Sequence, residues 1–337
     1  MNKKLIAMAV GAALAAPMAA NAGVTVYGQL QVEIASVDNK GYGENNTGGA
    51  RTGIATGESG IKMKDNKRGR LGFKVKEDLG GGLNAIAKFE WQVDTPNGNI
   101  ADGAREGWVG LKGGWGEFKA GRLKTAYKYT GGVKYDPFVT TYMEARKSGG
   151  MKGGAYGQNS FWSNTISYKN KWGGFGLWID YGLDEDDGTT DAGNMGEFSA
   201  AVKYGAKNWE IFAAMNGGYD ENTDGEDDSV TKVGGQFKFG GAHTISAQYE
   251  MDNKGGSAND ATIYFLGYQF KMGKNVLAAQ YGNTDVDGGS AADVTYYSLG
   301  WIYKFSKKTR TFIGYRNSDG DGDNDLTALS AGLRVDF

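Results

Sequence analysis

The sequence has no cysteine, a single histidine and only three prolines among 337 residues. Without cysteine, a disulfide framework and a thiolate metal site are both excluded. The negative mean hydropathy excludes a bundle of membrane-spanning helices, because each such helix needs about 20 consecutive apolar residues. The single histidine, His243, follows a turn at 240–242 and is interpreted as a surface residue.

The one long apolar run lies at the N-terminus. Lys3 and Lys4 precede an apolar stretch from Leu5 to Ala16, and small residues lead to Ala20-Asn21-Ala22. This order of a basic start, an apolar centre and a small-residue exit is typical of a secretory signal peptide. We expect cleavage after residue 22, which leaves residues 23–337 as a single domain.

The abundant residues are those of turns and strands, with 57 glycines, 19 tyrosines, 15 phenylalanines and 8 tryptophans. The last twelve residues, Leu326–Phe337, show the pattern most clearly, because every second residue counted back from Phe337 is apolar as far as Leu329. Such alternation predicts a strand with one apolar face. We expect Leu329, Leu333, Val335 and Phe337 on that face and Arg334 on the polar one.

The same alternation recurs along the chain and predicts sixteen strands. They are 24–36, 68–79, 83–94, 105–113, 117–123, 164–169, 175–183, 197–204, 209–216, 230–239, 243–252, 261–272, 275–283, 293–305, 310–318 and 326–337. Tight turns alternate with longer loops, which is typical of an outer-membrane barrel with short periplasmic turns and long extracellular loops. We therefore predict an all-β protein, a closed transmembrane antiparallel β-barrel of sixteen strands, wide enough to hold water.

The longest loop, the third, runs from Lys124 to Ser163, and loops of this length are usually functional or disordered. Asp136-Pro137 is a favourable start for a helix, with an acid at the cap and proline in the first turn. Phe138, Tyr142 and Ala145 would then share one face. We expect a short amphipathic helix here that packs against another part of the protein.

Several motifs resemble the general porins of Gram-negative outer membranes, in particular the neisserial and beta-proteobacterial branch. These motifs are Arg68-Gly69-Arg70-Leu71-Gly72-Phe73-Lys74, Glu77-Asp78-Leu79-Gly80-Gly81-Gly82-Leu83, Val109–Gly116 and Ala120-Gly121-Arg122, with Val24–Gly28 at the start and Phe337 at the end. The resemblance implies a homotrimer of sixteen-stranded barrels whose third long loop folds into the lumen and forms a constriction. It also implies a location in the cell outer membrane, beside lipid and lipopolysaccharide, after insertion by the barrel-assembly machinery, with Phe337 as the assembly signal.

The resemblance further implies which residues line the constriction. Its basic wall consists of Arg70, with Arg68 and Lys74 on the same face, of Arg105 and of Arg122, which needs a bulge or a strand end to turn inward. Asp136 and Glu144 are the candidate acids on the facing loop. Basic groups opposite acids create a field across the water that orients polar solutes and ions.

Acidic residues cluster in three predicted loops, 184–194, 219–229 and 319–325, and the rest of the chain has more bases than acids. We therefore expect a basic wall and a mild anion preference in a channel for passive diffusion of small hydrophilic solutes and ions. Acidic loops would repel nucleic acid. The aspartates of 319–325 are spaced as in a calcium loop but lack its final glutamate, so we expect neither a metal nor a cofactor.

Two alternatives remain open from the sequence. A channel specific for one anion or sugar usually has more strands and a track of aromatic residues along its lumen. Some outer-membrane barrels are hydrolases, but they need a histidine with serine or acids near the outer rim. Because His243 is predicted at the periplasmic end, we do not expect an enzyme.

Overall fold

The computed structural model describes residues 22–40, 59–146, 151, 161–183, 196–219, 228–253, 260–287, 293–320 and 325–337. The predicted signal peptide lies outside these residues except for Ala22, as does most of the three acidic loops. No helix among the described residues is long and apolar enough to span a membrane.

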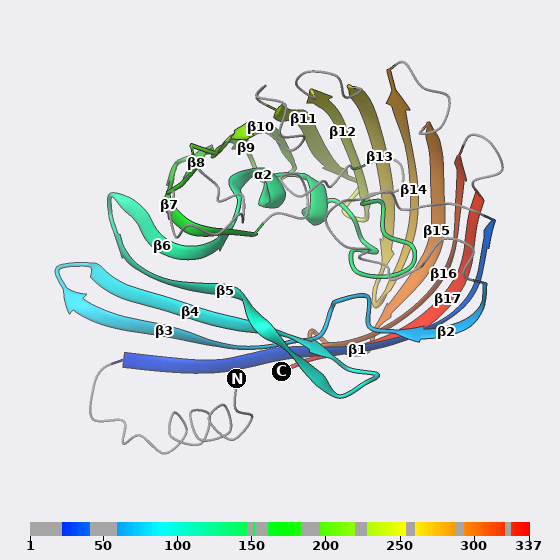
Figure 1. Ribbon diagram of the computed structural model, residues 1–337, viewed down its shortest axis with the longest axis horizontal. Coiled ribbons are helices and arrows are strands. Elements are labelled where there is room, and N and C mark those ends of the chain that lie inside the picture. Colours follow the sequence, from blue (N-terminus) through cyan, green and yellow to red (C-terminus); the bar gives the residue numbers. More distant parts are fainter. Residues whose placement is uncertain are drawn as a thin grey trace, which may run out of the picture.

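The described chain is a closed antiparallel barrel (Figure 1). Its first eight strands are β1 Ala22–Lys40, β2 Gly60–Lys64, β3 Arg70–Gly80, β4 Leu83–Asp94, β5 Asn99–Gly113, β6 Gly116–Lys124, β7 Phe161–Trp172 and β8 Phe175–Gly182. The others are β9 Phe198–Gly205, β10 Trp209–Tyr219, β11 Asp228–Phe239, β12 His243–Asn253, β13 Ala261–Met272, β14 Asn275–Val286, β15 Val294–Lys304, β16 Thr309–Gly320 and β17 Asp325–Asp336. Two helical turns, α2 Ala126–Tyr129 and η1 Gly132–Lys134, lie between β6 and β7.

These elements form sixteen positions around the barrel, as predicted, because β2 and β3 are two parts of one interrupted strand. β1 pairs with β3 through residues 22–29 and with β2 through residues 33–37. The prediction missed β2, which is only five residues long. It also began the fourth predicted strand at Arg105, whereas the corresponding β5 begins at Asn99 and leaves a tight connection at 95–98.

Alternating side chains give the wall two different faces. In β17, Leu326, Ala328 and Ser330 are at most 2% exposed, whereas Leu329 and Leu333 are 55% and 49% exposed. Exposed apolar side chains recur at every second position on most strands. A barrel that presents this face to lipid, and polar groups to its interior, has the pattern of a transmembrane barrel.

The two ends of the chain close the wall. Residues Gln29–Lys40 of β1 pair with Asp325–Asp336 of β17. The Phe337 amide donates a 3.0 Å hydrogen bond to the Gly28 carbonyl, and the Gly28 amide donates one of 3.3 Å to the Phe337 carbonyl. The Phe337 ring covers Gly28, where a Cβ would lie 2.1 Å from the ring.

Deleting Phe337 should lower the amount of assembled protein without changing the channels that do form. The deletion removes two seam hydrogen bonds, and a loss of roughly 1–2 kcal/mol corresponds to about a tenfold change in an equilibrium. We would measure the folded fraction in outer membranes by heat-modifiable migration, and conductance in planar bilayers. Phe337→Tyr, which keeps the ring and the backbone, is the control. Normal assembly of the deletion variant would contradict the expectation.

Candidate functional site

A five-residue break, Asp65–Gly69, interrupts the strand formed by β2 and β3. Asn66 and Lys67 have φ angles of 50° and 56°, a left-handed conformation that non-glycine residues adopt mostly at functional or strained sites. The Asp65 carboxylate stabilises the turn by accepting hydrogen bonds from the amides of Lys67 (2.9 Å) and Gly69 (3.1 Å). Gly69 is required because a Cβ there would lie 2.1 Å from the Val93 carbonyl oxygen.

The segment after β6, Thr125–Arg146, is anchored by α2, which contacts β9 and β10. The Thr125 hydroxyl caps the helix by accepting a hydrogen bond from the Lys128 amide. The Tyr127 hydroxyl donates a 2.9 Å hydrogen bond to the Glu250 carboxylate, and the Lys232 ammonium lies 4.0 Å from the centre of the Tyr127 ring. All three side chains are fully buried, so this end of the segment is held firmly.

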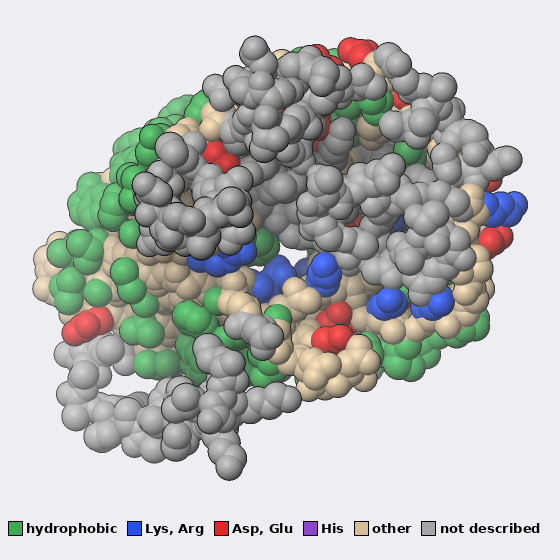
Figure 2. Space-filling view, viewed as in Figure 1, with side chains coloured by type: hydrophobic (Ala, Val, Ile, Leu, Met, Phe, Trp, Pro, Cys, Tyr) green, Lys and Arg blue, Asp and Glu red, His purple; other side chains and the backbone are tan. Residues whose placement is uncertain are grey.

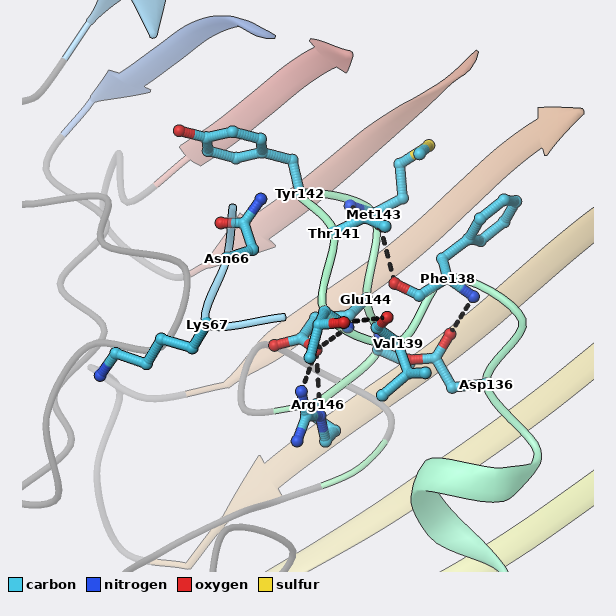
Figure 3. Close-up of polar contacts among 12 residues, drawn as sticks. Asn66, Lys67, Asp136, Phe138, Val139, Thr141, Tyr142, Met143, Glu144 and Arg146 are labelled. Carbon is cyan, nitrogen blue, oxygen red and sulfur yellow. Dashed lines mark hydrogen bonds and ion pairs between the residues drawn. The ribbon is translucent and has the colours of Figure 1, made fainter. Parts of the chain in front are cut away.

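The predicted helix at Asp136-Pro137 is wrong, because the helical turns lie earlier, in α2 and η1. The Asp136 carboxylate accepts hydrogen bonds from the amides of Phe138 (2.7 Å) and Ala145 (3.0 Å) and thereby closes a loop (Figure 3). Thr140 has a φ of 62°, which no right-handed helix accommodates. Phe138 and Ala145 are nevertheless buried, so the apolar pattern reflects packing without a helix.

Glu144 also bonds within the segment. Its carboxylate accepts a hydrogen bond of 2.7 Å from the Thr140 amide and forms an ion pair with Arg146 (Figure 3). Like Asp136, it is at most 4% exposed. The described contacts of Glu144 therefore shape the loop itself, whereas Asp136 also attaches the loop to the wall by accepting a 2.8 Å hydrogen bond from Gln280 of β14.

The tip of this segment is attached to the barrel wall through Glu33 of β1. The Glu33 carboxylate accepts hydrogen bonds of 3.0 and 3.2 Å from the Tyr142 amide, and another from the Asn66 side chain. Arg316 of β16 donates a 3.3 Å hydrogen bond to the Tyr142 carbonyl. One buried carboxylate thus joins the strand break to the loop.

Between the strand break, the wall and the loop lies a cavity of about 220 Å³. Seven of its lining residues are basic and none is acidic. The lining comprises Asn66, Lys67, Arg68, Arg70, Arg105, Lys128, Tyr129, Val133, Lys134, Val139, Thr140 and Arg146. Figure 2 shows lysine and arginine side chains gathered around a central opening in the molecule. The potential in this cavity favours anions.

Arg70 and Arg105, two of the predicted wall residues, share one carboxylate. Glu90 lies 3.7 Å from Arg70 and 3.3 Å from Arg105. A register shift beside Glu90 leaves Arg105 unpaired in the ladder, so it and its neighbour Glu106 both contact polar wall residues. Bulges of this kind often redirect side chains next to functional sites.

The other predicted basic residues differ in position. Arg68 lines the cavity, and its Nε has no hydrogen-bond partner among the described residues. Lys74 lies over the ring of Tyr27, and Arg122 donates hydrogen bonds to the Ala104 carbonyl and the Ser163 hydroxyl. Neither of these two is among the lining residues. The bulge expected near Arg122 is present, between Gly121 and Leu123.

Sequence reasoning missed four of the seven basic lining residues, namely Lys67, Lys128, Lys134 and Arg146. Lys67 directly precedes the Arg68 motif, and the other three lie in the loop that was already selected as functional. The signal in the sequence that points to these residues is the excess of bases over acids in this loop.

The segment should pack less firmly as the pH rises through about 6. Burial and the nearby charge of Glu144 raise the pKa of Asp136 to about 6, so the protonated form is favoured when the loop is packed. The protonated carboxyl thereby stabilises the packed loop by about 3 kcal/mol. This stabilisation is complete below a pH of about 4, the ordinary pKa of the group, and is lost as the pH rises through about 6. Amide-exchange opening free energies at Ala145, measured from pH 4 to 8, test this effect. Asp136→Asn should reduce the pH dependence, and an equal slope in both proteins would contradict the assignment.

No group of three metal-binding side chains occurs within the described ranges. Residues 321–324 of the calcium-like motif lie outside them. The expectation that this motif holds no metal therefore stays untested.

Comparisons with known proteins agree with this architecture. The model of the Gram-negative porin family matches residues 7–323. The major outer membrane protein P.IB of Neisseria meningitidis serogroup B is 27% identical over 261 residues, which cover 75% of this chain and 72% of that protein. The anion-selective porin from Comamonas acidovorans has the same fold, with a TM-score of 0.75 and 22% identity over 94% of this chain and all of that one. OmpF of Salmonella typhi matches with a TM-score of 0.72 and 17% identity over 94% and 98% of the two chains. The chain therefore belongs to the Gram-negative porin family and is an outer-membrane β-barrel that forms a channel for passive diffusion.

Proposed function

We propose that the basic cavity is the constriction of this channel, and that it gives the channel a mild preference for anions. In this proposal, Thr125–Arg146 and Asp65–Gly69, which meet at Glu33, fold into the lumen and narrow it. The observation that carries the proposal is the cavity lining, with seven bases and no acid. Small hydrophilic solutes would pass through the remaining water, because the site offers charge but no apolar pocket.

The expected acidic side of the constriction, with Asp136 and Glu144 facing the bases, receives no support from the contacts of these two residues. Both carboxylates are buried and accept hydrogen bonds from amides of the loop, and Asp136 also accepts one from the Gln280 side chain of β14. The acids that pair with wall bases are instead Glu90, with Arg70 and Arg105, and Glu106, with Lys88, and both acids belong to the wall. The proposed constriction is therefore lined by charge of nearly one sign. Such a lining favours anions, whereas bases facing acids would orient dipolar solutes.

Solute uptake distinguishes general diffusion from a substrate-specific channel. General diffusion predicts that liposome-swelling rates fall steeply with the size of unrelated sugars and show no saturation. Saturation by one sugar or anion would overturn the proposal in favour of the specific channel. An anion channel remains the leading alternative, because the Comamonas neighbour is described as anion-selective.

A hydrolase is disfavoured by the position of His243. Its ring stacks between Phe239 and Phe270, and its Nδ1 lies 2.7 Å from the Tyr268 hydroxyl. These neighbours place it in an aromatic cluster beside the tight turn 240–242. Aromatic clusters of this kind belong to the interfacial girdle of a barrel.

The homotrimer remains part of the proposal. The outer surface of β3 to β6 has an apolar groove of about 410 Å³, where Gly107, Ala87 and Ala120 leave space between Phe73 and Val109. Small residues let a partner surface approach closely, and the resemblance to trimeric porins favours a second and third copy there. Chemical crosslinking in native membranes should give a ladder that ends at three. Lipopolysaccharide contact and insertion by the barrel-assembly machinery remain predictions.

A further inference from the structure

Three basic residues occupy neighbouring positions on the last three strands. Lys304 of β15 is paired with Arg310 of β16, and Arg310 is paired with Arg334 of β17. Like charges directly opposite each other destabilise a sheet. The pairing register that brings these three bases together therefore lowers the stability of the sheet. A destabilising arrangement of this kind points to a function.

All three lie on the interior face of the wall. Two residues before Lys304 and two after Arg310, Ile302 and Phe312 are buried, whereas Trp301 and Ile313 are exposed on the lipid face. Because side chains alternate along a strand, Lys304 and Arg310 share the buried residues' side. Arg334 is 9% exposed and follows the same parity.

One carboxylate serves this group. Asp336 accepts a 2.6 Å hydrogen bond from Arg334 and lies 3.8 Å from Arg310. Lys304 forms no ion pair among the described residues, and its electrostatic neighbours include Arg310 and Lys271. The three bases and one acid therefore leave about two positive charges on this part of the interior.

The group lies between the cavity and the end of the barrel where the tight turns are. Residues 305–308 join β15 to β16 directly beside Lys304. On the other side, Gln29 of β1 is paired with both Asp336 and the cavity residue Arg70, and the charges of Arg334 and Asp336 act on Arg68. A row of bases thus leads across the closing seam to the cavity.

We propose that Lys304, Arg310 and Arg334 form a second anion site, at the mouth formed by the tight turns, which holds small anions as they enter or leave the constriction. The ligand class is small inorganic and carboxylate anions, and chloride is the probe. This inference rests on the proposed function, because it assumes that the cavity passes anions.

The experiment compares wild type with the double variant Lys304→Gln, Arg310→Gln in planar bilayers, with protein inserted from one side. Arg334 stays in place because it pairs with Asp336 next to the seam. Charges in solution are screened within about 10 Å at 0.1 M salt and 3 Å at 1 M. We expect the wild-type current in 0.1 M KCl to be larger when chloride enters from the tight-turn mouth. The double variant should lose at least half of this asymmetry in 0.1 M KCl and match wild type at 1 M, which also shows that it folds.

The matched control is Lys62→Gln, Lys64→Gln on β2, on the long-loop side of the strand break. It removes the same charge but should keep the wild-type asymmetry or increase it. The second site is overturned if the Lys304, Arg310 variant keeps the wild-type asymmetry in 0.1 M KCl, or if the control loses it equally. A different measurement tests the proposed function, namely the sign of the wild-type reversal potential in a KCl gradient. A sign that indicates cation preference would overturn the proposed function.

Discussion

Neutralising Arg68 and Lys134 together should remove most of the anion preference of the channel. Among the described residues neither side chain takes part in a salt bridge, so the double variant Arg68→Gln, Lys134→Gln leaves no carboxylate unpaired. A unit charge acts on an ion 4 Å away in water with about 1 kcal/mol, which is roughly a fivefold effect, and with less at longer range. We expect the chloride-to-potassium permeability ratio to fall two- to fivefold for each charge removed.

The matched comparison is Arg70→Gln, Arg105→Gln, which also removes two charges. These two arginines already share Glu90, so part of their charge is compensated within the wall. The loss of selectivity should be smaller than in the first variant. The Arg68 Nε is buried without a hydrogen-bond partner among the described residues, so Arg68→Gln should not lower thermal stability. A larger effect from Arg70 and Arg105 would contradict this ranking.

Replacing Glu33 with alanine should release both segments that line the cavity. The substitution leaves the Tyr142 amide and the Asn66 side chain without their buried acceptor, and each unsatisfied donor costs about 1–3 kcal/mol. We expect noisier single-channel currents, higher conductance and faster trypsin cleavage after Lys134 or Arg146. The barrel itself should persist, because its wall is held by backbone ladders.

The control for this prediction is Glu33→Gln, which keeps one side-chain oxygen as an acceptor for the Tyr142 amide. Its cleavage rate and conductance should lie between those of the wild type and the alanine variant. Strand content by circular dichroism shows whether the barrel is intact. If the alanine variant conducts and resists trypsin like the wild type, Glu33 is not the anchor.

The barrel could be predicted from the sequence because the wall obeys one rule. Alternation placed Leu329 and Leu333 on the lipid face and Arg334 on the other, and the structure agrees. The rule failed where pairing is irregular. β2 is too short to show a pattern, and the turn at Asp65–Gly69 depends on side-chain hydrogen bonds to the backbone that alternation does not encode.

The cavity was harder to predict because its residues come from different elements. Arg105 contacts the other charged wall residues through a bulge, and Lys128 and Lys134 reach the cavity through short helical turns. Asp136 and Glu144 were selected for their charge, but their carboxylates bind amides of their own loop. Whether an acid faces solvent or the backbone depends on the fold of the loop, which residue type alone does not determine.

The sign of the reversal potential in a KCl gradient tests the central claim most directly. Wild-type protein in a planar bilayer, with tenfold more KCl on one side, should give the sign of a channel that passes chloride more readily than potassium. The basic cavity predicts this sign at low and moderate salt, with a smaller value at 1 M where screening is strong. A reversal potential of the opposite sign would show that the seven bases do not control permeation.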